Sequence, residues 1–181
     1  MNLVLQKIEP VPGFFLRFDR LIAGIHGFHL TNHRQDDITG DMRFVLDTNV
    51  IVAAMRSPTG ASAALLMAAR RGEVTLVANV ALALEYETTC CRPEHGQAAG
   101  LGPAQVNLFL DAVIAMVEPV ETHFLWRPLL RDPGDELVLE AATNGLASAI
   151  VTFNERDFGT VPLRFGIEVL TPITALRRIR Q

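Results

Sequence analysis

The chain has 181 residues, of which 49% are hydrophobic, and its mean hydropathy is +0.25. This length and this apolar content suit one domain with a substantial core, and they exclude general disorder. The formal net charge of −4 and the pI near 5.7 leave no bulk basic field of the kind that attracts nucleic acid. The longest apolar runs are too short to cross a bilayer, so we expect no membrane partner.

The two cysteines of the chain, Cys90 and Cys91, are neighbours in the sequence. Adjacent cysteines rarely pair with each other, and no disulfide framework can be built from them. A reducing compartment fits this usage best, so we expect the protein in the cytoplasm.

Residues 1–41 show no sustained helical or strand period, and Met42 directly precedes the first clear strand. One interpretation is that Met42 is the natural start and that the preceding stretch is translated upstream sequence. The other is a genuine appendage that packs on the domain or on a partner. In either case we treat residues 1–41 as an N-terminal extension, not native or poorly ordered, and residues 42–181 as one domain.

From residue 42 onward, predicted strands alternate with predicted helices. The strands are expected at 43–47, 74–78, 148–152 and 166–170, with a short candidate at 118–121. The helices are expected at 61–72, 80–91, 103–117, 132–145 and 172–180, and a loop is expected at 92–102. Regular alternation of this kind predicts a parallel sheet covered by helices on both faces, which is a three-layer α/β/α fold.

Several helix ends carry recognisable boundary residues. Asn79 is a typical N-cap, and Pro103 suits the first position of a helix. Asp132 is the expected N-cap of another helix, and Pro133 is its expected first residue. Gly145 closes the helix that they open.

Polar residues gather where strands are predicted to end. The stretch "FVLDTNV" runs from three apolar residues into Asp47, and Asn154 and Asp157 follow the strand "AIVT". In open α/β sheets, ligands bind at the carboxyl edge of the strands. Asp47 also has a local interpretation as a turn residue.

Three further acids are candidates for a site at this edge. Asp132 and Asp135 open the helix that leads into the strand "AIVT", and Glu85 lies within a helix among apolar neighbours. Asp132 with Asp135 also fits a capping box, and Glu85 also fits a solvated helix face. Carboxylates that are packed together repel one another and need cations, and an all-oxygen set favours Mg²⁺ or Mn²⁺.

Four stretches in order resemble the PIN-domain family: "RFVLDTNVIVAAMRSPTGASAALL", "ALEYETTCCRP", "RDPGDELVLEAATNGLASAIVTFNERDF" and "GIEVLTPITAL". They are most similar to the toxins of toxin–antitoxin pairs, VapC-like in the broad sense, and the resemblance covers about residues 42–178. It implies that residues 42–181 form a PIN-like domain. It also implies a Mg²⁺- or Mn²⁺-dependent endoribonuclease that cleaves single-stranded RNA and acts as the toxin of a type II pair. The implied partners are the RNA substrate, a cognate antitoxin and, as a homodimer, a second copy of the chain.

The resemblance carries the family's acids over to named positions. Asp47, Glu85 and Asp135 become the catalytic acids and metal ligands, with Asp132 as an accessory acid. The chain departs from the family at the fourth acid, because "VTFN" puts Asn154 where an aspartate is usual. We take Asn154 as the positional match and Asp157, one helical turn further on, as the residue that adds the missing charge to the metal set. A neutral amide binds Mg²⁺ more weakly, so Asn154 and Asp157 are both candidates for the fourth ligand.

Supporting roles fall on residues next to these acids. Thr48 and Asn49 are expected to fix the Asp47 carboxylate and to position a water or a phosphate, and Thr152 belongs to the same group. Arginines outside the acids can contact the RNA backbone. The candidates are Arg56, Arg131 and Arg156.

Other classes of protein fit the sequence less well. A receiver domain needs a lysine late in the chain, and none follows Lys7. A phosphatase of the Asp-x-Asp type needs a second aspartate where Asn49 stands. The remaining alternative is a catalytically weak or inactive PIN-like module that binds RNA or protein, and Asn154 is the residue that favours it.

Overall fold

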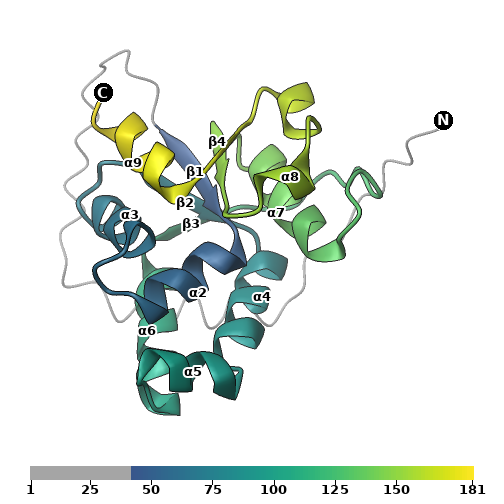
Figure 1. Ribbon diagram of the computed structural model, residues 1–181. Helices are drawn as coiled ribbons and strands as arrows, with labels where there is room; N and C mark the ends of the chain where they lie inside the picture. The colour runs from purple at the N-terminus through teal and green to yellow at the C-terminus, as the bar shows by residue number, and fades with distance from the viewer. Residues whose placement is uncertain (1–41) are drawn as a thin grey trace.

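The computed structural model describes residues 42–181, so the interpretation of residues 1–41 as an extension lies outside the described residues. Strands and helices alternate along the described chain (Figure 1). The strands are β1 (Arg43–Leu46), β2 (Thr75–Ala78), β3 (Val117–Pro119), β4 (Ala149–Val151) and β5 (Glu168–Leu170). The helices are α2 (Thr48–Arg56), α3 (Ala61–Arg70), α4 (Val80–Cys90), α5 (Pro93–Ala99), α6 (Pro103–Ala115), α7 (Pro133–Asn144), α8 (Glu155–Phe158), the 3₁₀ helix η1 (Pro162–Phe165) and α9 (Pro172–Ile179).

The five strands form one parallel sheet in the order β3-β2-β1-β4-β5, which places β1 at its centre. Phe44 of β1 pairs with Leu76 of β2 on one side and with Ala149 of β4 on the other. The backbone N–H of Asp47 donates to Val151 O at 2.9 Å, so the pairing of β1 with β4 continues to the residue after β1. The predicted three-layer α/β/α fold with a central parallel sheet is confirmed.

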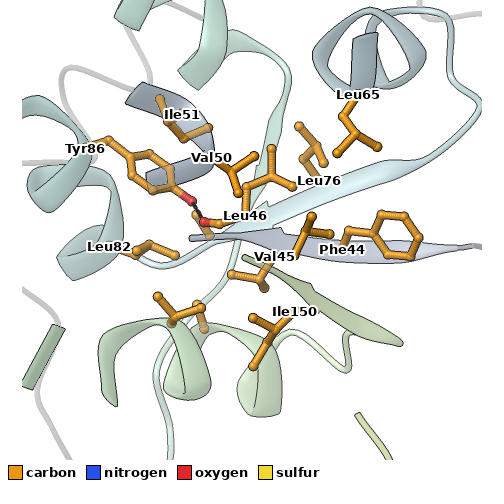
Figure 2. Close-up of a cluster of buried hydrophobic side chains, with 14 of the residues drawn as sticks. Phe44, Val45, Leu46, Val50, Ile51, Leu65, Leu76, Leu82, Tyr86 and Ile150 are labelled. Atoms are coloured by element: carbon orange, nitrogen blue, oxygen red, sulfur yellow. Dashed lines mark hydrogen bonds between the residues drawn. The ribbon is translucent and has the colours of Figure 1, made fainter. Parts of the chain in front are cut away.

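The core lies between the sheet and the helices on its two faces. Figure 2 shows Val50 and Ile51 of α2 and Leu65 of α3 on one side of the strands. Helix α7 packs against β1, β2 and β4. Val45 and Ile150 are fully buried, as expected for strands that are covered on both faces. Each such side chain contributes about 1.5–3 kcal/mol by leaving water, so the central strands hold the sheet edge in place.

The residues that were predicted to start the helices do so in the structure. The side chain of Asn79 accepts from Leu82 N at 2.9 Å, and that of Asp132 accepts from Gly134 N at 2.7 Å. Pro103 and Pro133 occupy the first positions of α6 and α7. These contacts satisfy backbone donors that the first turn of a helix leaves without partners.

The predicted loop at 92–102 was wrong, because this stretch contains α5. Pro93 occupies the first position of the helix, and Gly100 ends it with a φ of 68°. Gly96 is buried in the helix, and a Cβ at that position would lie 3.1 Å from Leu101 O. The glycine is therefore there for close packing and does not end the helix.

No single helix between residues 42 and 181 is long and apolar enough to cross a membrane. Two bent helix pairs, α2 with α3 and α5 with α6, reach that length and composition only when the two members of each pair are taken together.

Candidate active site

A cleft of about 640 Å³ brings together carboxylates from three separate elements, and we call it the first cleft. Asp47 reaches it from the turn between β1 and α2, Glu85 from α4, and Asp135 from the first turn of α7. Asp132 and Asn154 also line it. The three acids that were predicted as catalytic are thus neighbours in space, although they are far apart in the sequence.

Asp47 is the most buried of these acids, with 7% of its surface exposed. Its Oδ2 accepts from Thr152 Oγ1 and from Asn49 Nδ2, both at 2.6 Å. Asn49 Nδ2 also donates to Thr152 Oγ1 at 3.1 Å. Burial raises the pKa of the Asp47 carboxyl, and these hydrogen bonds oppose that rise. Asn49 and Thr152 therefore orient this carboxylate directly, whereas the hydroxyl of Thr48, also predicted to support Asp47, donates to Glu85.

Glu85 has one partnered and one unpartnered oxygen. Thr48 Oγ1 donates to Glu85 Oε1 at 3.0 Å, which links the start of α2 to α4. Glu85 Oε2 is buried and has no hydrogen-bond partner within the described chain. Burial raises the pKa of Glu85, the charges of Asp47 and Asp132 add to that rise, and the charge of Arg92 opposes it. A buried oxygen of this kind is costly unless something binds it, so it is available to a cation.

Tyr86 fixes the position of α4 relative to β1. The side chain is 2% exposed, and its hydroxyl donates to Leu46 O, as the dashed line in Figure 2 shows. Leu46 directly precedes Asp47, and Tyr86 directly follows Glu85. The hydrogen bond therefore joins the two backbone segments that carry these acids. The sequence pattern did not predict this role, because a lone tyrosine within a helix gives no local signal.

Asp135 lies where the negative charges meet. Its pKa is raised from the ordinary value of 3.8 to about 6, first by burial and then by the charges of Asp47, Asp132, Asp157 and Glu85. The N-terminus of α7 offsets part of this repulsion, because the helix dipole favours anions there. A cation that binds among these groups would relieve the rest.

Gly134 lies at the start of α7, next to the carboxylates of Asp132 and Glu85. A Cβ on Gly134 would lie 3.2 Å from Asp132 Oδ1 and 3.5 Å from Glu85 Oε1. The first of these distances is tighter than most side-chain contacts, and the second is an ordinary van der Waals contact. The absence of a side chain therefore leaves room for the Asp132 carboxylate to cap α7.

The two candidates for the fourth position face different clefts. Asn154 lines the first cleft, and its N–H donates to Thr152 Oγ1 at 2.9 Å. Asp157 of α8 lines an adjoining cleft of about 680 Å³, which we call the second cleft. Its charge still raises the pKa of Asp135. The structure therefore places Asn154 in the cleft that holds Asp47, and Asp157 in the second cleft, which Asp135 also lines.

The arginines predicted to contact RNA are divided between the two clefts. Arg56 lines the first cleft, and Arg131 and Arg156 line the second. Arg92 and His95 also line the first cleft and were not predicted. They flank the start of α5, so the prediction of a loop there hid their common orientation.

The donor set of the first cleft fits a hard divalent cation. Within residues 42–181, no group of three or more His, Cys, Asp or Glu side chains forms a ready-made metal site. Mg²⁺ does not require one, since it keeps several waters and is usually held by one or two carboxylates. The unpartnered Glu85 Oε2 and the mutual repulsion of the acids both favour a cation at this place. Asp47, Glu85 and Asp135 are the residues that would hold it.

Fold and cleft together define a three-layer α/β/α domain whose carboxylates gather at the carboxyl edge of a parallel sheet. The family model described as "PIN domain" matches residues 43–156, which is more than half of the chain. The chain therefore belongs to the PIN-domain family, whose members are in general nucleases and typically use divalent metal ions. No curated protein and no solved structure matches the chain.

Proposed function

We propose that this PIN-domain protein is a Mg²⁺- or Mn²⁺-dependent endoribonuclease that cleaves single-stranded RNA. The observation that carries the proposal is the convergence of Asp47, Glu85 and Asp135 on one cleft, with the pKa of each raised. Raised pKa values of several acids in a cleft are typical of functional sites.

The residues around the acids suit phosphodiester hydrolysis. A divalent cation, when bound, neutralises phosphate charge and lowers the pKa of a bound water. Thr152 and Asn49 hold the Asp47 carboxylate in one orientation, and Thr48 does the same for Glu85. Arg56 and Arg92 line the same cleft and supply positive charge for a phosphate.

The biological part of the proposal is that the protein is the toxin of a type II toxin–antitoxin pair and acts in the cytoplasm. Its support is the similarity of the four sequence stretches to such toxins. The expected partners are a cognate antitoxin and a second copy of the chain. Co-expression with a small protein encoded next to it, followed by co-purification and a growth assay, tests this part separately from the chemistry.

A cleavage assay tests the chemistry. The purified protein should cut a single-stranded RNA in millimolar Mn²⁺ and should lose this activity in EDTA. Asp47→Asn and Asp135→Asn should each abolish cleavage. Asp111→Asn, at an exposed position on α6, makes the same chemical change away from the cleft and should leave cleavage unchanged. Cleavage at the wild-type rate by both site variants would refute the assignment.

A second candidate function is a PIN-like module that binds RNA or protein without cleaving. Two observations favour it: Asn154 is neutral where the family usually has an acid, and residues 42–181 contain no ready-made three-ligand site. Tight RNA binding in Mn²⁺ without any cleavage, together with no thermal stabilisation by Mn²⁺, would support this candidate over the nuclease.

A further inference from the structure

The first and second clefts are joined at the start of α7. Asp132 and Asp135 line both of them, so the two clefts meet at one of the acids that would hold the metal, Asp135, and at the accessory acid Asp132. A linear ligand bound at these acids therefore has an open path to either side.

Each cleft has arginines that are available to an anion. Arg56 and Arg92 line the first cleft, and Arg131 and Arg156 line the second. Within residues 42–181, none of the four lies within ion-pairing distance of a carboxylate. Guanidinium groups without a partner suit phosphate, because their planar fork donates two parallel hydrogen bonds.

The second cleft also has an apolar wall. Leu129, Leu130 and Val161 line it and pack against the hydrophobic core. Hydrogen bonds hold the backbone of this wall, since Glu136 Oε1 accepts from Leu129 N at 2.5 Å and from Leu130 N at 2.7 Å. The second cleft has a volume of about 680 Å³, which lies within the range of small-molecule sites. An apolar wall beside two arginines matches a nucleotide, which has a flat base and an anionic phosphate.

We propose that the second cleft binds the part of a single-stranded RNA that flanks the scissile bond, so that one strand crosses the first turn of α7 and occupies both clefts. This inference rests on the proposed function. A cation at the shared acids would offset their repulsion of one phosphate, and the arginines on both sides hold the neighbouring phosphates of the strand. Arg131 and Arg156 contact the phosphates of the flank, and the apolar wall contacts its bases.

Binding of RNA to the full-length chain tests the second cleft by itself. Asp47→Asn is used as the background, so that no RNA is cut, and the ligand is a fluorescent single-stranded RNA in Mg²⁺ buffer. The test variant is Arg131→Ala with Arg156→Ala. The control is Arg70→Ala with Arg177→Ala, which removes the same charge at exposed positions that line neither cleft.

The test variant should raise the Kd by about ten-fold or more relative to the control, because it loses two charge-assisted contacts. The slope of log K against log salt should become shallower by about 1.4, which is about 0.7 for each lost phosphate contact on a single strand. A Kd and a salt slope equal to those of the control would overturn the proposal.

A cleavage experiment with Asp47 intact gives a second, independent test. A phosphodiester bond that the wild-type protein cuts is first mapped in a long RNA. Two shorter RNAs are then made, one without the 5′ flank of that bond and one without the 3′ flank. Removal of one flank should slow the wild-type protein about ten-fold and should leave the Arg131→Ala, Arg156→Ala variant unaffected. Equal slowing of both proteins overturns the proposal. Absence of any cleavage by the wild type refutes the proposed function instead, and the binding test still decides on the cleft.

Discussion

Helix α7 carries carboxylates of two kinds: Glu136 and Glu140 form a partnered set, and Asp135 belongs to the mutually repelling acids of the first cleft. Glu136 and Glu140 are each 4% exposed and have donors on the connector before the helix. Glu136 accepts from two backbone N–H groups, and both oxygens of Glu140 accept from Arg127. Asp135, one residue before Glu136, faces other acids instead. Neighbouring residues on one helix thus have opposite electrostatic surroundings.

This difference separates a structural role from a functional one. A buried carboxylate with its own donors holds two segments together and has no need of a further ligand. A set of carboxylates that repel one another is unfavourable as it stands and gains from a cation. The partnered set therefore anchors the connector before α7, and the set of mutually repelling acids is the place where a metal should bind.

The largest expected effect is on catalysis. Asp47→Asn removes one of the charges that would hold the metal, and it should lower RNA cleavage by about 10³-fold, as the loss of one preorganised electrostatic group does. It should also abolish the thermal stabilisation by Mn²⁺, which acts by mass action on the native state. Asparagine caps a helix as well as aspartate does, so circular dichroism should show an unchanged fold. Retained Mn²⁺ stabilisation would remove Asp47 from the metal set.

Substitution of Glu136, a member of the partnered set, should lower the free energy of unfolding. Glu136→Ala leaves the buried N–H groups of Leu129 and Leu130 without an acceptor, and we expect a loss of about 3 kcal/mol in the free energy of unfolding. Glu136→Gln keeps an acceptor oxygen and should lose about half as much. Urea unfolding measures both. If the two variants are equally stable, the carboxylate oxygen is not what anchors this connector.

The set of mutually repelling acids should respond in the opposite direction. In the absence of metal, Asp135→Asn should raise the free energy of unfolding at pH 7 by about 1 kcal/mol, because it removes one of several repelling charges and solvent screening reduces the gain. Thermal unfolding in EDTA measures this difference. A destabilised Asp135→Asn would contradict the comparison between the two sets.

The pH dependence of Asp135 follows from its pKa of about 6, against an ordinary value of 3.8. Between these values the folded protein binds more protons than the unfolded protein, so metal-free stability falls as the pH rises through this window. Asp135→Asn should make this part of the pH profile flat. Stabilisation of the wild type by Mn²⁺ should grow over the same window, because a metal binds the ionised carboxylate.

The smallest expected effect concerns the fourth position. Asn154→Asp adds a full charge to the first cleft and should tighten Mn²⁺ binding several-fold, since an opposite charge near a cation favours it. Asp157→Asn acts from the second cleft and should reduce cleavage less than Asp47→Asn does. A Mn²⁺ titration of RNA cleavage ranks the two. An inactive Asp157→Asn beside a silent Asn154→Asp would move the fourth ligand to Asp157.

Sequence patterns predicted most of the fold, because the relevant physics is local. The apolar runs at 43–47 and 148–152 predicted the buried strands, and Asn79 and Asp132 predicted the starts of two helices. Helices α2 and α5 were not predicted, because residues 48–56 were given no element and residues 92–102 were expected as a loop. For α5 the reason is tertiary, since Gly96 is needed for close contact with Leu101 and the helix packs against α2 and α4.

The sequence by itself determined which residue types stand at the carboxyl edge, because strand direction and the alternation of elements place Asp47 and Asn154 there. Only the tertiary structure decided which groups share a cleft and which have partners. The burial of Tyr86, the unpartnered oxygen of Glu85 and the pairing of Glu140 with Arg127 all depend on contacts between elements. Whether a carboxylate is structural or available to a metal is set by the donors that surround it in space, and those donors come from distant parts of the chain.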